Sequence, residues 1–162
     1  MSDARFEDGA AGGRDAPLRL MAQEGGDVPA LSALIQDAVF TGADVTFVPA
    51  RRRFAMLLTR LRWEDTAQAQ AEGRPFERVK SLLVVESITA LRRAGFDPKD
   101  ASAVQSLLAI SFAARDVLGG TLTLTLSGGG AIAMEVEAID ITLRDVTRPH
   151  RAIAQKLPDH GA

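Results

Sequence analysis

The chain has 162 residues, of which 46% are hydrophobic and 25% are charged, and its formal net charge is −2. This composition is typical of one globular domain and excludes collagen-like and disordered chains. Cysteine is absent and the two histidines are His150 and His160, which excludes disulfides, cysteine-ligated metals, thiol nucleophiles and histidine-based catalysis within the expected fold.

Both ends of the chain differ from its middle. Residues 1–16 are rich in Gly, Ala, Asp and Arg and lack an apolar run, so we expect a flexible tail rather than a secretory signal. We expect a single domain over 17–148 and a polar tail over 149–162. No stretch of about 18 apolar residues occurs. The sequence therefore favours a cytoplasmic protein without a membrane-spanning segment.

A short strand over residues 18–21 opens the expected domain, and a helix over residues 27–40 follows it. Asp27 suits the N-cap, Pro29 is tolerated in a first turn, and Gly42 is a candidate C-cap. One apolar stripe recurs at helical spacing along this segment: Val28, Leu31, Leu34, Ile35 and Ala38.

We expect the remainder of the domain to form strands, so that the fold has about nine in all. Alternating or continuous apolar runs predict strands at 45–49, 53–63, 79–85, 88–93, 106–113, 121–126 and 131–136. Residues 64–75 could form a loop or a short exposed helix, and residues 127–130 a hairpin turn. The pattern predicts an α+β fold: a mainly antiparallel, strongly bent sheet or two-sheet, barrel-like body with the helix covering one side.

In two of the expected strands, the apolar residues switch between odd and even sequence positions; we call this a parity change. The changes occur at Ser87 and Ala138, in the similar sequences Val-Glu-Ser-Ile and Val-Glu-Ala-Ile, 51 residues apart. A strand that keeps its apolar face inward through such a change needs a bulge or a corner. Residues 45–97 and 104–148 are therefore either two copies of one antiparallel unit or two strand sets that resemble each other by chance.

The central strands carry apolar side chains on a face that the helix alone cannot cover. Phe54, Met56 and Leu58 lie on this face, and its cover comes either from the second strand unit or from a second chain. We expect cover by the chain itself and hence a monomer that Met56→Asp would unfold.

The middle of the chain is basic, with ten basic and five acidic residues between positions 51 and 93. Arginine accounts for most of it: Arg51, Arg52, Arg53, Arg60, Arg62, Arg92 and Arg93. Arg60, Arg62, Arg92 and Arg93 are the candidate binding residues, since together they could hold an anion. The alternative is that these charges serve solubility and protect strand edges. Nucleic acid is not favoured, because aromatic residues do not alternate with the arginines.

Catalytic and metal motifs are missing from the sequence. Gly128-Gly129-Gly130 joins two expected strands instead of preceding a helix, so it suits a turn and not a phosphate site. Glu135 and Glu137 suit a solvated strand face, and Trp63 suits the rim of the core with a hydrogen-bonded indole. We expect no metal and no cofactor.

Three classes of function remain open. A non-catalytic binding or protein-interaction module leads, because no catalytic constellation is present. The alternatives are an anion or nucleic-acid binder that uses the arginines and a small enzyme that uses Asp, Glu, Arg and Ser.

Several short segments also resemble a known family. They are Gln36-Asp37-Ala38-Val39, Arg52-Arg53-Phe54-Ala55, Trp63-Glu64, Phe76-Glu77-Arg78-Val79, Leu108-Ala109-Ile110-Ser111-Phe112, and Gly128-Gly129-Gly130-Ala131-Ile132 followed by Glu135-Val136-Glu137-Ala138-Ile139. Over residues 17–148 the chain resembles a bacterial family of small uncharacterised proteins that share a domain of unknown function. The resemblance implies a bacterial cytoplasmic protein without an assigned activity, and it assigns no functional residue.

Overall fold

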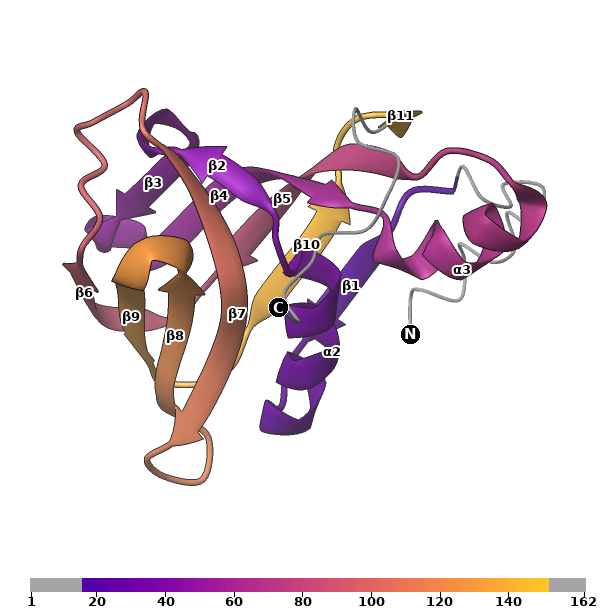
Figure 1. Ribbon diagram of the computed structural model, residues 1–162. Coiled ribbons are helices and arrows are strands. Elements are labelled where there is room, and N and C mark those ends of the chain that lie inside the picture. The colour runs from indigo at the N-terminus through magenta and orange to yellow at the C-terminus, as the bar shows by residue number, and fades with distance from the viewer. Residues whose placement is uncertain (1–15, 152–162) are drawn as a thin grey trace.

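The computed structural model describes residues 16–151, which form two α-helices, four short 3-10 helices and eleven strands (Figure 1). The helices are η2 (Gly25–Asp27), α2 (Val28–Ile35), η3 (Gly42–Asp44), η4 (Pro49–Arg51), α3 (Trp63–Glu72) and η5 (Ser127–Gly129). The strands are β1 (Arg19–Ala22), β2 (Val39–Thr41), β3 (Val45–Val48), β4 (Arg53–Leu61), β5 (Glu77–Val85), β6 (Ile88–Ala94), β7 (Val104–Ala114), β8 (Gly120–Leu126), β9 (Ala131–Val136), β10 (Ile141–Asp145) and β11 (His150–Arg151). The tails expected at 1–16 and 149–162 fall mostly outside the described residues.

All eleven strands belong to one antiparallel sheet. Its main path runs β1-β10-β5-β4-β2-β7-β8-β9-β6, while β3 pairs with β4 and β11 pairs with β5. The sheet curls so that side chains from both of its ends meet in one hydrophobic core, against which α2 packs. These features confirm the predicted α+β class with a strongly bent antiparallel sheet.

The sheet turns two corners at the predicted parity changes. Ser87 has a φ of 62° and separates β5 from β6, and the bend at Ala138 separates β9 from β10. After the corners, β6 pairs with β9 and β10 pairs with β5. The predicted bends are confirmed, and each one carries a strand from one half of the sheet to the other.

The two halves share the same connectivity. In the first half β3 pairs with β4 and β4 with β5, which bends into β6; in the second, β7 pairs with β8 and β8 with β9, which bends into β10. Glutamates at the two corners also meet neighbouring arginines: Arg53 pairs with Glu86 and Arg52 with Glu137, both at 3.0 Å. An origin of 45–97 and 104–148 by duplication stays a prediction.

The first helix is shorter than predicted. It ends at Ile35, because Gln36 is extended and Asp37 has a φ of 67°. Residues 39–41 instead form β2, which bridges β4 and β7, so strand pairing outweighs the local helical period. Gly42 does not cap a helix: it packs where a Cβ would lie 2.5 Å from the Pro98 carbonyl oxygen.

A second helix occupies the segment that the sequence left open. α3 begins at Trp63, so the strand expected over 53–63 ends two residues earlier, at Leu61. The indole Nε1 of Trp63 donates a hydrogen bond to the Gln36 carbonyl at 3.0 Å, as predicted for a tryptophan at the rim of the core. The short strand β11 lies in the segment expected to be a polar tail, because two residues are too few to show an apolar period.

Met56 is fully buried in the main core. Its neighbours there come from α2 and from both halves of the sheet. The chain itself therefore covers this face of β4, in agreement with the expected intramolecular cover.

Candidate functional site

The four candidate arginines do not share one surface. Arg60 and Arg62 are buried near the end of β4, with exposed fractions of 0% and 4%. Arg92 and Arg93 are exposed on β6, in the other half of the sheet. Successive residues of a strand point to opposite faces, so these two also diverge from each other. The anion site expected from the four arginines is therefore not assembled.

Arg60 is the centre of a buried ion-pair cluster. Its guanidinium donates two hydrogen bonds of 2.8 Å to the carboxylate of Glu64, on the first turn of α3. It also contacts Asp145 at 3.0 Å and the hydroxyl of Ser81 at 3.0 Å. Ser81 in turn donates to Asp145 at 2.8 Å, and Asp145 accepts from the Leu18 amide at 2.8 Å. Each buried charge therefore has partners from within the chain.

Arg62 forms a second, adjoining group of ion pairs. Its guanidinium contacts the carboxylate of Glu77 and lies 3.7 Å from that of Asp65. Asp65 is itself held by two hydrogen bonds from Arg74, at 2.8 and 3.0 Å. These contacts join the start of α3 to Arg62 and Arg74 on either side of the helix and, through Glu77, connect Arg62 to β5, which indicates a structural role.

The electrostatics of the Arg60 cluster favour fully ionised groups. Burial disfavours the charged form of Glu64, but hydrogen bonds and the charge of Arg60 outweigh it and lower the pKa of this carboxyl group. The pKa of Arg60 is raised in the same way by Glu64 and Asp145, against the opposing effect of burial. A general acid requires a raised carboxyl pKa, so Glu64 is not suited to that role.

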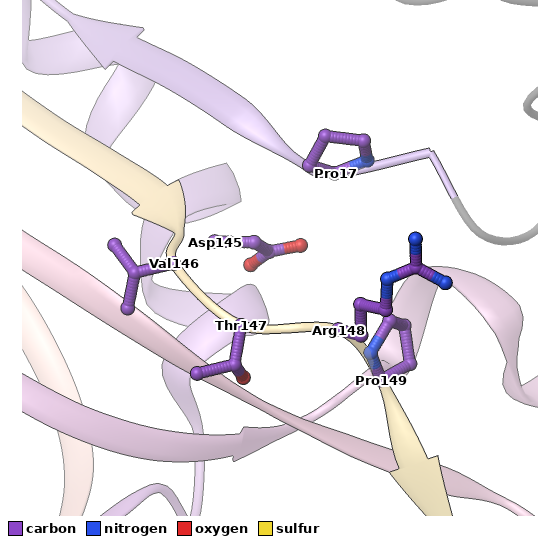
Figure 2. A pocket seen from close by; sticks show the side chains of 6 residues that line it. All are labelled: Pro17, Asp145, Val146, Thr147, Arg148 and Pro149. Carbon is purple, nitrogen blue, oxygen red and sulfur yellow. The ribbon is translucent and has the colours of Figure 1, made fainter.

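A pocket of about 560 Å³ lies beside this cluster (Figure 2). Pro17 faces the run from Asp145 to Pro149, which connects β10 to β11. The side chain of Asp145 is only 2% exposed and already binds Arg60 and Ser81. The hydroxyl of Thr147 accepts a hydrogen bond from the Lys80 amide at 3.1 Å. Asp145 and Thr147 are therefore engaged with the chain, which does not favour catalysis in this pocket.

Arg92 belongs to a surface network around Glu135. This carboxylate accepts hydrogen bonds from Thr121 at 2.8 Å, from Arg92 at 3.1 Å and from Arg115 at 3.2 Å. The hydrogen bond from Thr121 is the first cause of its lowered pKa, followed by the one from Arg92. Glu135 therefore stays ionised, which agrees with the solvated strand face expected from the sequence.

An exposed apolar pair marks the loop between β7 and β8, here called the β7–β8 tip (residues 115–119). Val117 is 97% exposed and Leu118 is 68% exposed. Figure 1 shows this loop projecting beyond the rest of the sheet. Isolated exposed aliphatic residues are ordinary on a protein surface, whereas here two adjacent ones lie on one projecting loop.

The β7–β8 tip is held in place by several contacts. The Asp116 carboxylate accepts hydrogen bonds from the Gly119 amide at 2.8 Å, from Arg115 at 3.1 Å and from the Leu118 amide at 3.2 Å. These bonds lower its pKa, the Gly119 bond most. Arg115 donates to the carbonyl of Val136 at 3.2 Å. Gly119 packs so closely that a Cβ would lie 2.7 Å from the Glu137 carbonyl oxygen. The backbone of the loop that carries the exposed pair is therefore fixed, or braced, by these contacts.

Two hollows of about 420 and 450 Å³ lead from α2 to the β7–β8 tip. Both have Gly25 and Phe112 in their walls, and we call them together the β7 groove. The first lies between the start of α2, at Val28 and Pro29, and β7. The second runs between residues 23–26 and the β7–β8 tip. The groove has the size of typical ligand pockets.

Sequence reasoning did not single out this region. The only signal was the pair Val117-Leu118 in a loop whose other residues are Arg, Asp and Gly. Periodicity cannot show that a loop side chain remains exposed after folding, since that depends on which segments pack around it.

The described residues contain no helix long and apolar enough to cross a membrane. Among residues 16–151 there is also no group of three or more His, Cys, Asp or Glu side chains that could hold a metal ion.

Comparison with known proteins connects the chain to a family without an assigned function. No curated protein matches the sequence, and no solved structure matches it. A family model described as "protein of unknown function (DUF2948)" matches residues 18–160, nearly the whole chain and all but the first residues of the described domain. The chain belongs to the DUF2948 family.

Proposed function

We propose that the protein is a non-catalytic interaction module that binds a segment of a partner protein in the β7 groove and on the β7–β8 tip. The observation that carries the proposal is the exposed pair Val117 and Leu118 on a braced loop. Ordering a projecting loop costs conformational entropy. The exposed pair itself gives the fold little apolar burial in return, whereas contact with a partner would bury it.

The chemistry of the other sites supports the same choice. The buried carboxylates and arginines pair with one another, and the carboxyl groups with shifted pKa values, Glu64, Asp116 and Glu135, are all shifted downward. An acid–base enzyme needs at least one group that titrates near neutral pH. A reducing compartment such as the cytoplasm is part of this proposal, and the lack of cysteine in the sequence supports it.

The proposal is tested by selecting binders from a library of displayed random twelve-residue peptides against the full chain. We expect enrichment of peptides that bind the wild-type protein and bind the double variant Val117→Ser, Leu118→Ser at least tenfold more weakly. Val104→Ser is the matched control, because Val104 is 70% exposed at the other end of β7 and lies outside the groove. Enriched peptides should bind this control as they bind the wild type.

Two outcomes would contradict the proposal. One is a selection that enriches no peptide. The other is that enriched peptides bind the double variant as tightly as the wild-type protein. That result would show that the peptides bind elsewhere than at the β7–β8 tip.

A further inference from the structure

The β7 groove contains an unpaired strand edge. β7 pairs with β2 only over residues 104–106 and with β8 over residues 107–114. Beyond Ser106, no strand among residues 16–151 lies on the side of β7 that faces α2. Resting on the proposed function, we infer that this edge, from Phe112 to Ala114, binds an extended peptide segment of the partner as an added β-strand.

The hydrogen-bonding direction of β7 follows from two contacts. The Arg115 amide donates to the Gly119 carbonyl, so every second residue before it, such as Ala113 and Ser111, bonds to β8. The backbone groups of the residues between them therefore point away from β8. The Ile110 amide confirms this direction, because it donates to the hydroxyl of Ser32 in α2 at 3.1 Å.

Phe112 and Ala114 follow Ile110 on the same edge. Their backbone amides and carbonyls point into the groove, and both residues line its walls. An added strand satisfies such groups with main-chain hydrogen bonds, while alternate side chains of the peptide enter the hollows on either side.

Beyond Ile110 the edge lacks charged and proline residues that would prevent strand addition. Exposed edges are usually protected by charged side chains, proline, a bulge, or a covering helix or loop. Helix α2 covers the edge of β7 at Ile110, whose amide donates to Ser32. The sequence Ile110-Ser-Phe-Ala-Ala114 contains neither charge nor proline. The bulge in the β7–β8 ladder lies earlier, between Leu107 and Ala109. From Phe112 to Ala114 the edge is thus regular and carries neither charge nor proline.

The walls of the groove indicate the chemistry of the peptide. Val28, Phe112, Val117 and Leu118 supply apolar surface, and the charged wall residues are Glu24 and Asp116, both acidic. No basic residue is among the described wall residues of either hollow. Arg115, beside the second hollow, pairs with Asp116 at 3.1 Å, so Glu24 supplies the remaining negative charge. The complementary partner is an extended segment in which apolar residues alternate with lysine or arginine.

The test uses a ten-residue peptide of alternating valine and lysine and two N-methylated forms. One form carries backbone N-methyl groups on every valine and the other on every lysine, so that each form blocks one edge of the extended peptide. We expect one form to bind within threefold of the parent peptide and the other at least tenfold more weakly. A peptide of alternating valine and glutamate should also bind at least tenfold more weakly than the parent.

Hydrogen exchange of the Phe112 and Ala114 amides provides the second readout. Both amides should exchange rapidly in the free protein and become protected when the parent peptide binds. Protection in the free monomer would assign the edge to another segment of this chain, and protection that rises with dimer formation would assign it to a second copy. Either result overturns the inference.

The two proposals fail in different ways. If peptides bind through the β7–β8 tip but both methylated forms bind equally, or both lose binding equally, strand addition is wrong and the interaction module stands. If neither the alternating peptide nor any peptide from the selection binds, the proposed function fails as well.

Discussion

The Arg60 cluster and the β7–β8 tip depart from the usual arrangement of a globular protein in opposite directions. The cluster places charge inside: Arg60 has no exposed surface, although arginine is almost never fully buried unless it is paired. The β7–β8 tip places apolar side chains outside, at Val117 and Leu118. Both are local exceptions to the usual burial of apolar side chains and exposure of charged ones.

The difference lies in where the partners are. Arg60 has its partners inside the chain, in Glu64, Ser81 and Asp145. Val117 and Leu118 stay largely solvent-exposed, while the backbone beneath them is fixed by Asp116. A buried charge with internal partners indicates a structural role. In the proposed function, the braced apolar surface is the part of the molecule that contacts an external partner. The following predictions test each side of this comparison.

The largest effect is expected from Arg60→Ala. Removing the guanidinium leaves Asp145 buried without its cation, and loss of one partner of a buried pair costs about 3–5 kcal/mol of unfolding free energy. Urea denaturation measures this loss. Arg92→Ala is the control, because Arg92 is 61% exposed and exposed pairs contribute about 0–1 kcal/mol. A loss below about 1 kcal/mol for Arg60→Ala would contradict the structural role.

An intermediate effect is expected from Gly119→Ala. The new Cβ would meet the backbone carbonyl oxygens of Val136 and Glu137, so the base of the β7–β8 tip must shift at a cost of about 1–3 kcal/mol. Thermal or urea unfolding measures the cost. Gly26→Ala is the control, since no atom lies within 4 Å of its added Cβ. Equal stability of the two variants would show that the tip is not braced as described.

A smaller, pH-dependent effect is expected from Glu64→Gln. The pKa of Glu64 is lower in the folded protein than its ordinary value of 4.5. Its stabilising contribution is therefore present above the unfolded-state pKa and disappears as the pH falls through the folded-state pKa. The wild type should exceed the variant in unfolding free energy at neutral pH, with the difference shrinking below about pH 4.5. A difference that grows with acid would contradict this assignment.

Much of the fold could be predicted from the sequence because its signals are local. Strict alternation over residues 121–126 marks a half-buried strand, and the parity changes at Ser87 and Ala138 mark corners. The extent of α2 could not be predicted in this way. The helical period continues to Ala38, yet the helix ends at Ile35, and Val39 and Phe40 form a strand instead. That choice depends on β4 and β7, which lie far away in the sequence.

The candidate site was less accessible to sequence reasoning. Clustering of arginine along the chain suggested one binding surface, but strand alternation and the two corners distribute these residues. Arg60 points into the protein and Arg92 lies on the other half of the sheet. The free edge of β7 could not be predicted, because it depends on the order of strands in the sheet. It lies beyond the short pairing with β2, where no further strand follows.

The most direct test of the central claim is to measure folding stability and peptide affinity on the same preparation of the Val117→Ser, Leu118→Ser variant. We expect an unfolding free energy within about 0.5 kcal/mol of the wild type, as for exposed positions in general, together with at least tenfold weaker binding of the selected peptides. A stability loss of about 2 kcal/mol or more, or unchanged peptide affinity, would contradict the central claim.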